Sequence, residues 1–346
     1  MSTTHPARPT ARQRAADLRV LRPSDPAPAD GRFAWAVSAA HLWILVGLFL
    51  DGWFHIHRGD GESFFTPWHA ILYSGVGVTV AVHLWEADRS GGTRPGYGPS
   101  LAGGVVVLLA GVVDGVWHTL LGVEADLEAL LSPPHLLLIT AGTLVFAGPL
   151  RAALRPTGGA GLPTAVSAAF VVTGLGFFTQ YANPFTHLYP VLGYTPQDGG
   201  GTLAVAAEGA VAQLREVSGV GGVVLWAVLV GGAVALLRAR TALVAGSLAV
   251  VVAVPSLFMT TQRGTYAFVP AILLAALVTE LLGRRLSPSL TALAATTSLF
   301  TGWVLTLLAT EELAWSAELL AGSIGSAAAA GYLVGWIVQN GGSRTA

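Results

Sequence analysis

The chain contains no cysteine, no lysine and only two methionines, Met1 and Met259. The absence of cysteine excludes disulfides, thiolate metal ligands and cysteine nucleophiles. The scarcity of methionine argues against a conduit for Cu(I), because that ion prefers soft sulfur ligands. Charged residues make up only 11% of the chain, and the formal net charge is -1. No basic surface for a nucleic acid is therefore expected.

Apolar residues dominate the composition. They account for 53% of the sequence, and the mean hydropathy is +0.63, whereas a soluble domain carries about 25% charged residues. The expected fold is all-α: a polytopic integral membrane protein with about ten transmembrane helices in the lipid bilayer. The expected spans are 33–56, 67–87, 100–121, 134–151, 164–182, 219–237, 241–261, 265–283, 287–309 and 313–338.

The distribution of arginine predicts the orientation of these spans. Residues 1–32 hold several arginines and no apolar run, which predicts a disordered cytoplasmic arm rather than a secretory signal. Most other arginines fall in turns on the same side, so both termini of this multi-pass cell-membrane protein are expected in the cytoplasm. Residues 152–346 are expected to hold the remaining helices and a long outer loop, 183–218. Within that loop, 203–217 are expected to form an amphipathic helix on the membrane surface.

A polar unit occurs twice in the first half of the chain, in residues 33–87 and again in 100–151. Each copy reads Asp-x3-His, followed by a hydroxyl residue, a proline, any residue and a second histidine. The two copies start 63 residues apart. Apolar helices resemble one another by chance because they use few residue types, but two matching sets of Asp, His, Pro and His indicate a duplication.

The spacing within each copy predicts that three ligands converge. Residues four apart share a helix face, so the Asp and the first His point the same way at the outer end of a span. The proline opens the returning helix, and the second His falls in its first turn. Two histidines and one carboxylate suit Cu(II), Zn(II) or Fe(II). The predicted ligand sets are Asp51, His55 and His69 in the first copy and Asp114, His118 and His135 in the second.

The same residues also allow interpretations that involve no metal. A histidine at a membrane interface is often an amphipathic anchor, and an aspartate can cap a turn. The same groups would then form a hydrogen-bonded interfacial network without metal. Four further residues are candidates for supporting roles around the sites, with solvated loop charges as the alternative: His57, Glu62, Glu124 and His187. His41 and His83 lie further along the spans, away from these sets, and are interpreted as packing or interfacial residues.

The first copy resembles a metal motif of the copper membrane monooxygenases, the particulate methane and ammonia monooxygenases. In that family the motif belongs to one membrane subunit and has Asp-x3-His followed by a histidine within a Phe-Thr-Pro-Ser-His phrase. The corresponding residues here are Asp51, His55, Phe65-Thr66-Pro67-Trp68-His69 and Tyr73, with Trp68 in place of the Ser. The resemblance is confined to the motif. It implies that Asp51, His55 and His69 bind copper, and internal repetition extends those roles to Asp114, His118 and His135.

Three functional hypotheses follow. The leading one is an integral membrane metalloprotein that binds copper (or zinc or iron) on the outer side, and its enzymatic version is an oxidase or monooxygenase for a small or lipophilic substrate. A divalent metal-ion transporter is the first rival, because duplicated helix pairs are common in transporters. The apolar spans below both sites argue against it. The second rival is a non-catalytic subunit or assembly factor with a structural metal. Homo-oligomers and partner subunits fit each hypothesis.

Overall fold

The computed structural model of the chain describes residues 31–58, 66–122, 126–194 and 208–341. No β-strand lies within these ranges. The α-helices are α2 (Gly31–Arg58), α3 (Pro67–Ser90), α4 (Gly98–Leu121), α5 (Asp126–Leu131), α6 (Pro133–Phe146), α7 (Gly148–Ala153), α8 (Leu162–Phe178), α9 (Glu208–Arg240), α10 (Ser247–Arg263), α11 (Val269–Gly283), α12 (Pro288–Thr310) and α13 (Ala317–Asn340). Short 3-10 helices are η2 (Gln180–Ala182) and η4 (Tyr266–Phe268).

Most of these helices match the expected spans. Seven are long and apolar enough to cross a membrane: α2, α3, α4, the Val211–Arg240 part of α9, Tyr266–Gly283, α12 and α13. The apolar helices α6 and α8 are shorter, with 14 and 17 residues, and α10 also has 17. The expectation of an all-α, multi-pass membrane protein is therefore confirmed. The expected N-terminal arm lies outside the described residues, except that α2 already begins at Gly31.

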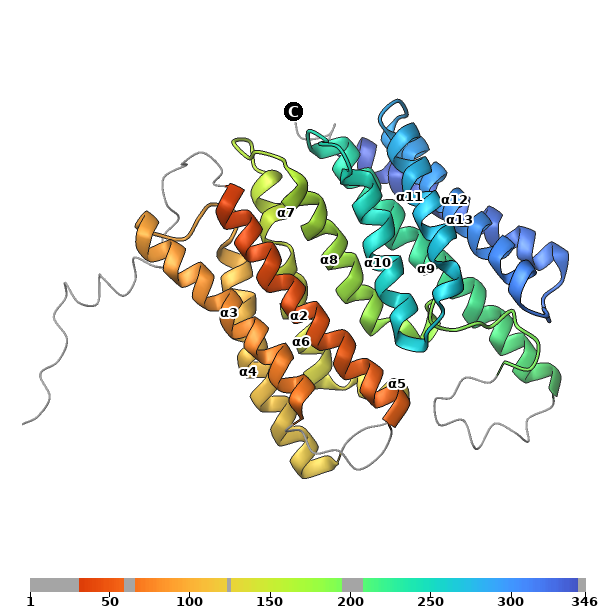
Figure 1. The fold of residues 1–346 in the computed structure, drawn as a ribbon, viewed down its shortest axis with the longest axis horizontal. Coiled ribbons are helices and arrows are strands. Elements are labelled where there is room, and N and C mark those ends of the chain that lie inside the picture. The colour runs from red at the N-terminus through yellow and green to blue at the C-terminus, as the bar shows by residue number, and fades with distance from the viewer. Residues whose placement is uncertain (1–30, 59–65, 123–125, 195–207, 342–346) are drawn as a thin grey trace, which may run out of the picture.

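The helices that carry the two polar units form two neighbouring pairs. α2 packs along α3, α4 packs along α6, and α3 joins the pairs by packing on α4. α8 lies against α2, α6 and α10 and so connects the pairs to the second half of the bundle. The end of α2 and the starts of α3 and α6 lie at the same end of the bundle as the end of α4 (Figure 1). Both copies of the unit are therefore placed at one end of the molecule.

The expected span 134–151 is broken in the structure. α6 ends at Phe146, and α7 begins with Gly148-Pro149, because proline has no N–H to continue the helix. Neighbouring hydroxyls bond the backbone groups at the break. Ser167 Oγ donates to the Phe146 carbonyl at 2.5 Å and accepts from the Leu150 N–H at 3.1 Å. Hydrogen bonds of this kind, from a Ser side chain to the freed backbone groups, allow a helix to break at membrane depth.

Removing the Ser167 hydroxyl should therefore destabilise the fold. In Ser167→Ala the buried Phe146 carbonyl and Leu150 N–H both lose a partner, which costs about 1–3 kcal/mol for an unsatisfied buried group. The free energy of unfolding in detergent measures the loss. Thr140→Ala is the matched control, because the Thr140 hydroxyl bonds the Leu136 carbonyl of its own helix. Equal losses in the two variants would contradict the role given to Ser167.

The expectation of a separate surface helix at 203–217 is wrong for the described part of that range. α9 runs without a break from Glu208 to Arg240. Gly219 and Gly222 do not interrupt it, because both serve close packing: a Cβ at Gly219 would collide with the Trp315 ring, and a Cβ at Gly222 with the carbonyl oxygen of Ala182 in η2. The part of the expected outer loop from 183 to 194 is also packed against the bundle. Trp303 Nε1 donates to the Pro184 carbonyl at 2.9 Å, and the Ala314 N–H donates to the Pro190 carbonyl at 2.8 Å.

Candidate metal centres

The first centre joins the end of α2 to the start of α3. Asp51 Oδ1 lies 3.6 Å from His55 Nε2 and 3.4 Å from His69 Nε2. The side chains of Asp51 and His69 are mostly buried, whereas that of His55 is 43% exposed. The ligand atoms of the three residues all lie within 4.8 Å of one another. The structure therefore brings the predicted set together as a group that could hold a metal ion.

The second centre repeats this arrangement at the end of α4 and the start of α6. Asp114 Oδ1 lies 3.4 Å from His118 Nε2 and 3.8 Å from His135 Nε2. The two imidazole rings are 5.9 Å apart and inclined by 55°, and the corresponding rings of the first centre are 6.3 Å apart with the same inclination. The Asp114 side chain is only 2% exposed. A carboxylate so deeply buried in a membrane protein favours a cation beside it.

The separations within each group fit a shared ion. Two ligand atoms bound to one ion at about 2.0–2.2 Å, with a tetrahedral angle between them, lie about 3.3–3.6 Å apart. A direct N–H···O hydrogen bond between the same atoms would be about 2.9 Å long. The four Asp–His separations range from 3.4 to 3.8 Å. Only the longest separation, between Asp114 Oδ1 and His135 Nε2, would have to shorten slightly for both atoms to bind one ion.

Local sequence places the second histidine of each centre. Thr66 caps α3 by accepting from the His69 backbone N–H at 3.2 Å, and Pro67 occupies the first turn. This cap fixes the start of the helix on which His69 stands. The rings of Phe54 and Trp68 stack with centroids 3.6 Å apart and so hold the end of α2 against the start of α3. The hydroxyl residue, the proline and the histidine therefore act as one positioning unit.

In the second centre, the other ring nitrogens of the histidines are also engaged. Ser132 Oγ lies 2.8 Å from His135 Nδ1, and the Gly122 carbonyl oxygen lies 3.3 Å from His118 Nδ1. If each Nδ1–H donates to its oxygen, each Nε2 presents its lone pair toward Asp114. Such outer hydrogen bonds orient metal-binding imidazoles and fix the tautomer. The Ser132 hydroxyl thus contacts the ring of the second histidine, whereas the Thr66 hydroxyl of the first centre accepts from a backbone N–H.

Tyr73 lies between the two centres. It stands one helical turn after His69, with ring centroids 6.2 Å apart. Its phenol packs directly on Gly111 of α4, where a Cβ would collide with the ring. The sequence points to Tyr73 only through the family resemblance. Its spacing from His69 is the local feature that predicts its position, because the two residues lie one turn apart on α3.

A cavity of about 490 Å³ adjoins Tyr73. One face of α4 forms most of its wall, through Leu108, Gly111, Val112, Gly115, Val116 and Thr119. These residues are apolar apart from Thr119. The cavity therefore offers an apolar space beside the helix that carries Asp114 and His118.

Gln262 of α10 supports the first centre from outside. Its side chain is fully buried, and its Nε2 donates to the Phe49 carbonyl of α2 at 3.0 Å. Its Oε1 lies 2.9 Å from the position that a Cβ would take at Gly52, the residue after Asp51. Gln262 thus fixes the turn of α2 on which Asp51 stands. The sequence alone does not reveal this role of Gln262, because a contact across 213 residues has no local signal.

Gln262→Leu should therefore weaken metal binding at the first centre alone. Changes in residues that support metal ligands typically reduce affinity about 10–100-fold, and we expect a reduction at the low end of that range. Isothermal titration of the apo protein with Cu(II) or Zn(II) would resolve the two centres. The second centre serves as the internal control, because its ligands stand on α4 and α6. A uniform loss at both centres would show general unfolding instead.

Two of the four supporting candidates, His57 and His187, are described by the structure, and neither joins a ligand group. His57 stacks on Trp53 and bonds the Trp53 carbonyl through Nδ1. His187 stacks on Tyr189, and its Nδ1 lies 2.9 Å from the Tyr194 hydroxyl. The structure thus places His187 in an aromatic cluster after α8 and not in either ligand group, because residues 183–194 pack on α12 and the turn after it. The other two candidates, Glu62 and Glu124, lie outside the described residues.

His41 and His83 are buried away from both centres. His41 packs edge-on against Phe146, and His83 packs against Phe33 and Tyr97. His83 Nδ1 bonds the Thr79 carbonyl at 2.8 Å. Neither residue belongs to a ligand group within the described ranges. Their positions agree with the interpretation as packing residues.

No known protein family, curated protein or solved structure matches this chain.

Proposed function

We propose that the chain is an integral membrane metalloprotein that binds copper at two Asp/His/His centres. The observation that carries this proposal is the repeated geometry. Two separately encoded sets of ligands converge with similar separations and the same ring inclination. Each set brings three possible ligand atoms within 4.8 Å of one another, which interfacial anchors or turn caps do not require.

Copper is the preferred metal for two reasons. Two imidazoles and a carboxylate suit Cu(II), although they also suit Zn(II) and Fe(II). The resemblance of the first copy to the metal motif of the copper membrane monooxygenases favours copper among these. Three protein ligands leave coordination positions for O2 or a substrate.

The enzymatic form of this proposal is an oxidase or monooxygenase for a small, lipophilic substrate. The apolar cavity beside Tyr73 supports it, because that cavity adjoins the helix bearing Asp114 and His118. Asp51, Asp114 and the four histidines would serve as ligands, and the copper would supply the chemistry of O2. Tyr73, one helical turn after His69 and packed on Gly111 of α4, places a phenol hydroxyl beside them.

Three measurements on one preparation test the proposal. Metal analysis of the purified protein should find stoichiometric copper, and O2 consumption in nanodiscs should require that copper. Flux of the same ion into liposomes is the third measurement. Flux without O2 consumption would replace the enzymatic proposal by transport, and stoichiometric metal with neither activity would indicate a structural or assembly role. The absence of any bound metal after loading with copper, zinc or iron would remove the proposal itself.

The centres are proposed to face the outside of the cell membrane. The opposite end of the bundle carries most of the described arginines: Arg32, Arg89, Arg94, Arg151, Arg155, Arg238, Arg240, Arg284 and Arg285. By the positive-inside rule that end is cytoplasmic. We expect a single cysteine at Thr310, on the end of the centres, to react with an impermeant maleimide in intact cells. A cysteine at Thr157 should react only after lysis, and the reverse pattern would invert the orientation.

A further inference from the structure

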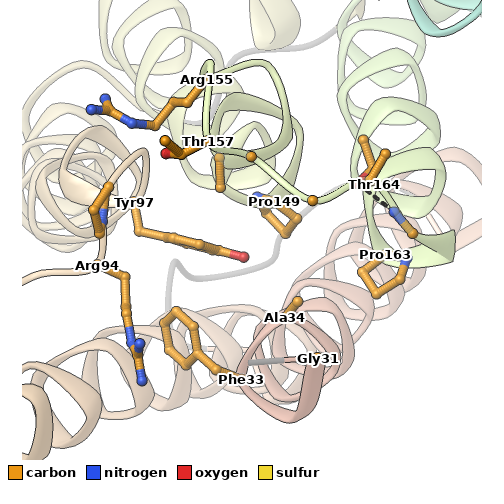
Figure 2. Close-up of a pocket in the computed structure, with 16 residues that line it drawn as sticks. Gly31, Phe33, Ala34, Arg94, Tyr97, Pro149, Arg155, Thr157, Pro163 and Thr164 are labelled. Atoms are coloured by element: carbon orange, nitrogen blue, oxygen red, sulfur yellow. Dashed lines mark hydrogen bonds between the residues drawn. The ribbon is translucent and has the colours of Figure 1, made fainter. Parts of the chain in front are cut away.

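A second cavity, of about 340 Å³, opens at the end of the bundle opposite the metal centres. It lies between the start of α2, the turn from α3 to α4 and the turn from α7 to α8. Phe33, Tyr97 and Pro149 form its apolar walls (Figure 2). None of the ligands of the metal centres contributes to it, so its role is separate from theirs.

The Tyr97 hydroxyl is directed into the middle of this cavity (Figure 2). Tyr97 is only 6% exposed, and its ring is fixed by edge contacts with Phe33 and His83. No hydrogen bond joins its hydroxyl to any residue that the structure describes. Burial raises the pKa of Tyr97, against a smaller opposite effect of Arg94, so the group stays a neutral donor. The residue is largely buried, but its hydroxyl opens into the cavity and can donate there to an acceptor on a ligand.

The start of α8 forms the opposite wall of the cavity. Residues 157–161 form a glycine-rich turn that leads into α8, whose first turn contains Pro163 and Thr164. This turn is closed by its own hydrogen bonds, because the Gly161 N–H donates to Thr164 Oγ1 at 3.3 Å and the Thr164 N–H donates to the Gly161 carbonyl at 3.0 Å. The dipole of the helix favours negative charge at this end. This positive helix end and the Tyr97 hydroxyl face the same space from two sides (Figure 2). The cavity is therefore suited to an anion.

Its surroundings place it at the level of the lipid headgroups. Arg94 and Arg155 stand at the rim, and Arg155 is exposed whereas Arg94 is paired with Glu86 (Figure 2). On the same end of α3, the Arg89 guanidinium lies 4.6 Å from the ring centre of Trp85, which is 57% exposed. Exposed tryptophan and arginine at a helix end mark the membrane interface. A free solute is thus a less fitting ligand than a lipid.

We propose that this cavity binds the phosphate of an anionic phospholipid headgroup. The Tyr97 hydroxyl and the N-terminus of α8 face the phosphate, and Arg155 adds charge at the rim. Phe33 and Pro149 contact the apolar part of the lipid next to the headgroup. Basic pockets between helices at the charged face of a membrane protein have this chemistry. The proposal is independent of the metal centres and of any activity there.

Native mass spectrometry of the full chain, released from detergent with added phosphatidylglycerol or phosphatidylcholine, tests it. Wild type should retain phosphatidylglycerol in preference to phosphatidylcholine. Tyr97→Phe keeps the ring and removes the donor, and it should weaken the phosphatidylglycerol adduct about tenfold, as for a hydrogen bond to a charged group. Arg155→Gln should weaken it about fivefold, as for one arginine near an anionic headgroup.

Arg240→Gln is the matched control, because it removes an exposed arginine from the same face outside the cavity. It should leave the adduct unchanged. Equal binding of the two lipids, or equal losses in Arg155→Gln and Arg240→Gln, would overturn the proposal. A third arm adds glycerol 3-phosphate or inorganic phosphate at millimolar concentration. If either displaces the lipid completely, the site is one for a free phosphate compound and the assignment to a lipid fails.

Discussion

Asp114→Ala should lower the metal content of the purified protein from about two ions per chain to about one, because three converging ligands bind each ion. Asp114 supplies the only carboxylate of the second group and lies 3.4 Å and 3.8 Å from its two histidines. Without it, two neutral imidazoles remain, which cannot balance the charge of a divalent ion at a buried site. The first centre should keep its ion, because its ligands come from α2 and α3.

Asp51→Ala should produce the same loss at the first centre, and the double variant should bind almost no metal. His57→Ala is the matched control, since His57 lies near the first centre but bonds Trp53 instead. Inductively coupled plasma mass spectrometry gives the stoichiometry after gel filtration. Helical circular dichroism should stay unchanged in all variants, because insertion of the apolar helices does not depend on the ion. Full metal retention in Asp114→Ala would refute the second centre.

The two ligand groups were predictable from the sequence because each rests on local rules. The Asp and first His of a copy are four residues apart on one helix, and the proline fixes the start of the next. Both conditions act within a few residues, and the structure meets them in both copies. The apolar composition of the spans likewise predicted the all-α membrane fold, because composition alone decides whether a helix suits a bilayer.

Features that depend on distant packing were not predictable. The break between α6 and α7 depends on Pro149, but it is stable because Ser167 and Ser100 from other helices bond its carbonyls. α9 continues through Gly219 and Gly222, which pack against Trp315 and against η2. The support of Asp51 by Gln262 joins α2 to α10. None of these contacts has a periodic or local signal, so only the assembled bundle reveals them.

Metal binding should also raise the thermal stability of the protein strongly. The ligands of each centre come from two helices and converge only in the folded bundle, so an ion binds the folded state and stabilises it by mass action. At a free concentration about 1,000 times its dissociation constant, one bound ion adds about 4 kcal/mol. Two centres should add their contributions, because each closes a different helix pair.

The temperature of unfolding in detergent, followed by tryptophan fluorescence, measures this effect with and without Cu(II) or Zn(II). We expect a large upward shift in wild type that a chelator reverses. His69→Ala should remove one contribution, and the combination of His69→Ala with His135→Ala should remove the shift entirely. His69→Ala alone and His135→Ala alone should each retain about half of the shift in unfolding temperature. A shift that persists in the double variant would locate the bound ions outside the two groups, since no other group of three ligand side chains lies in the part of the chain that the structure describes.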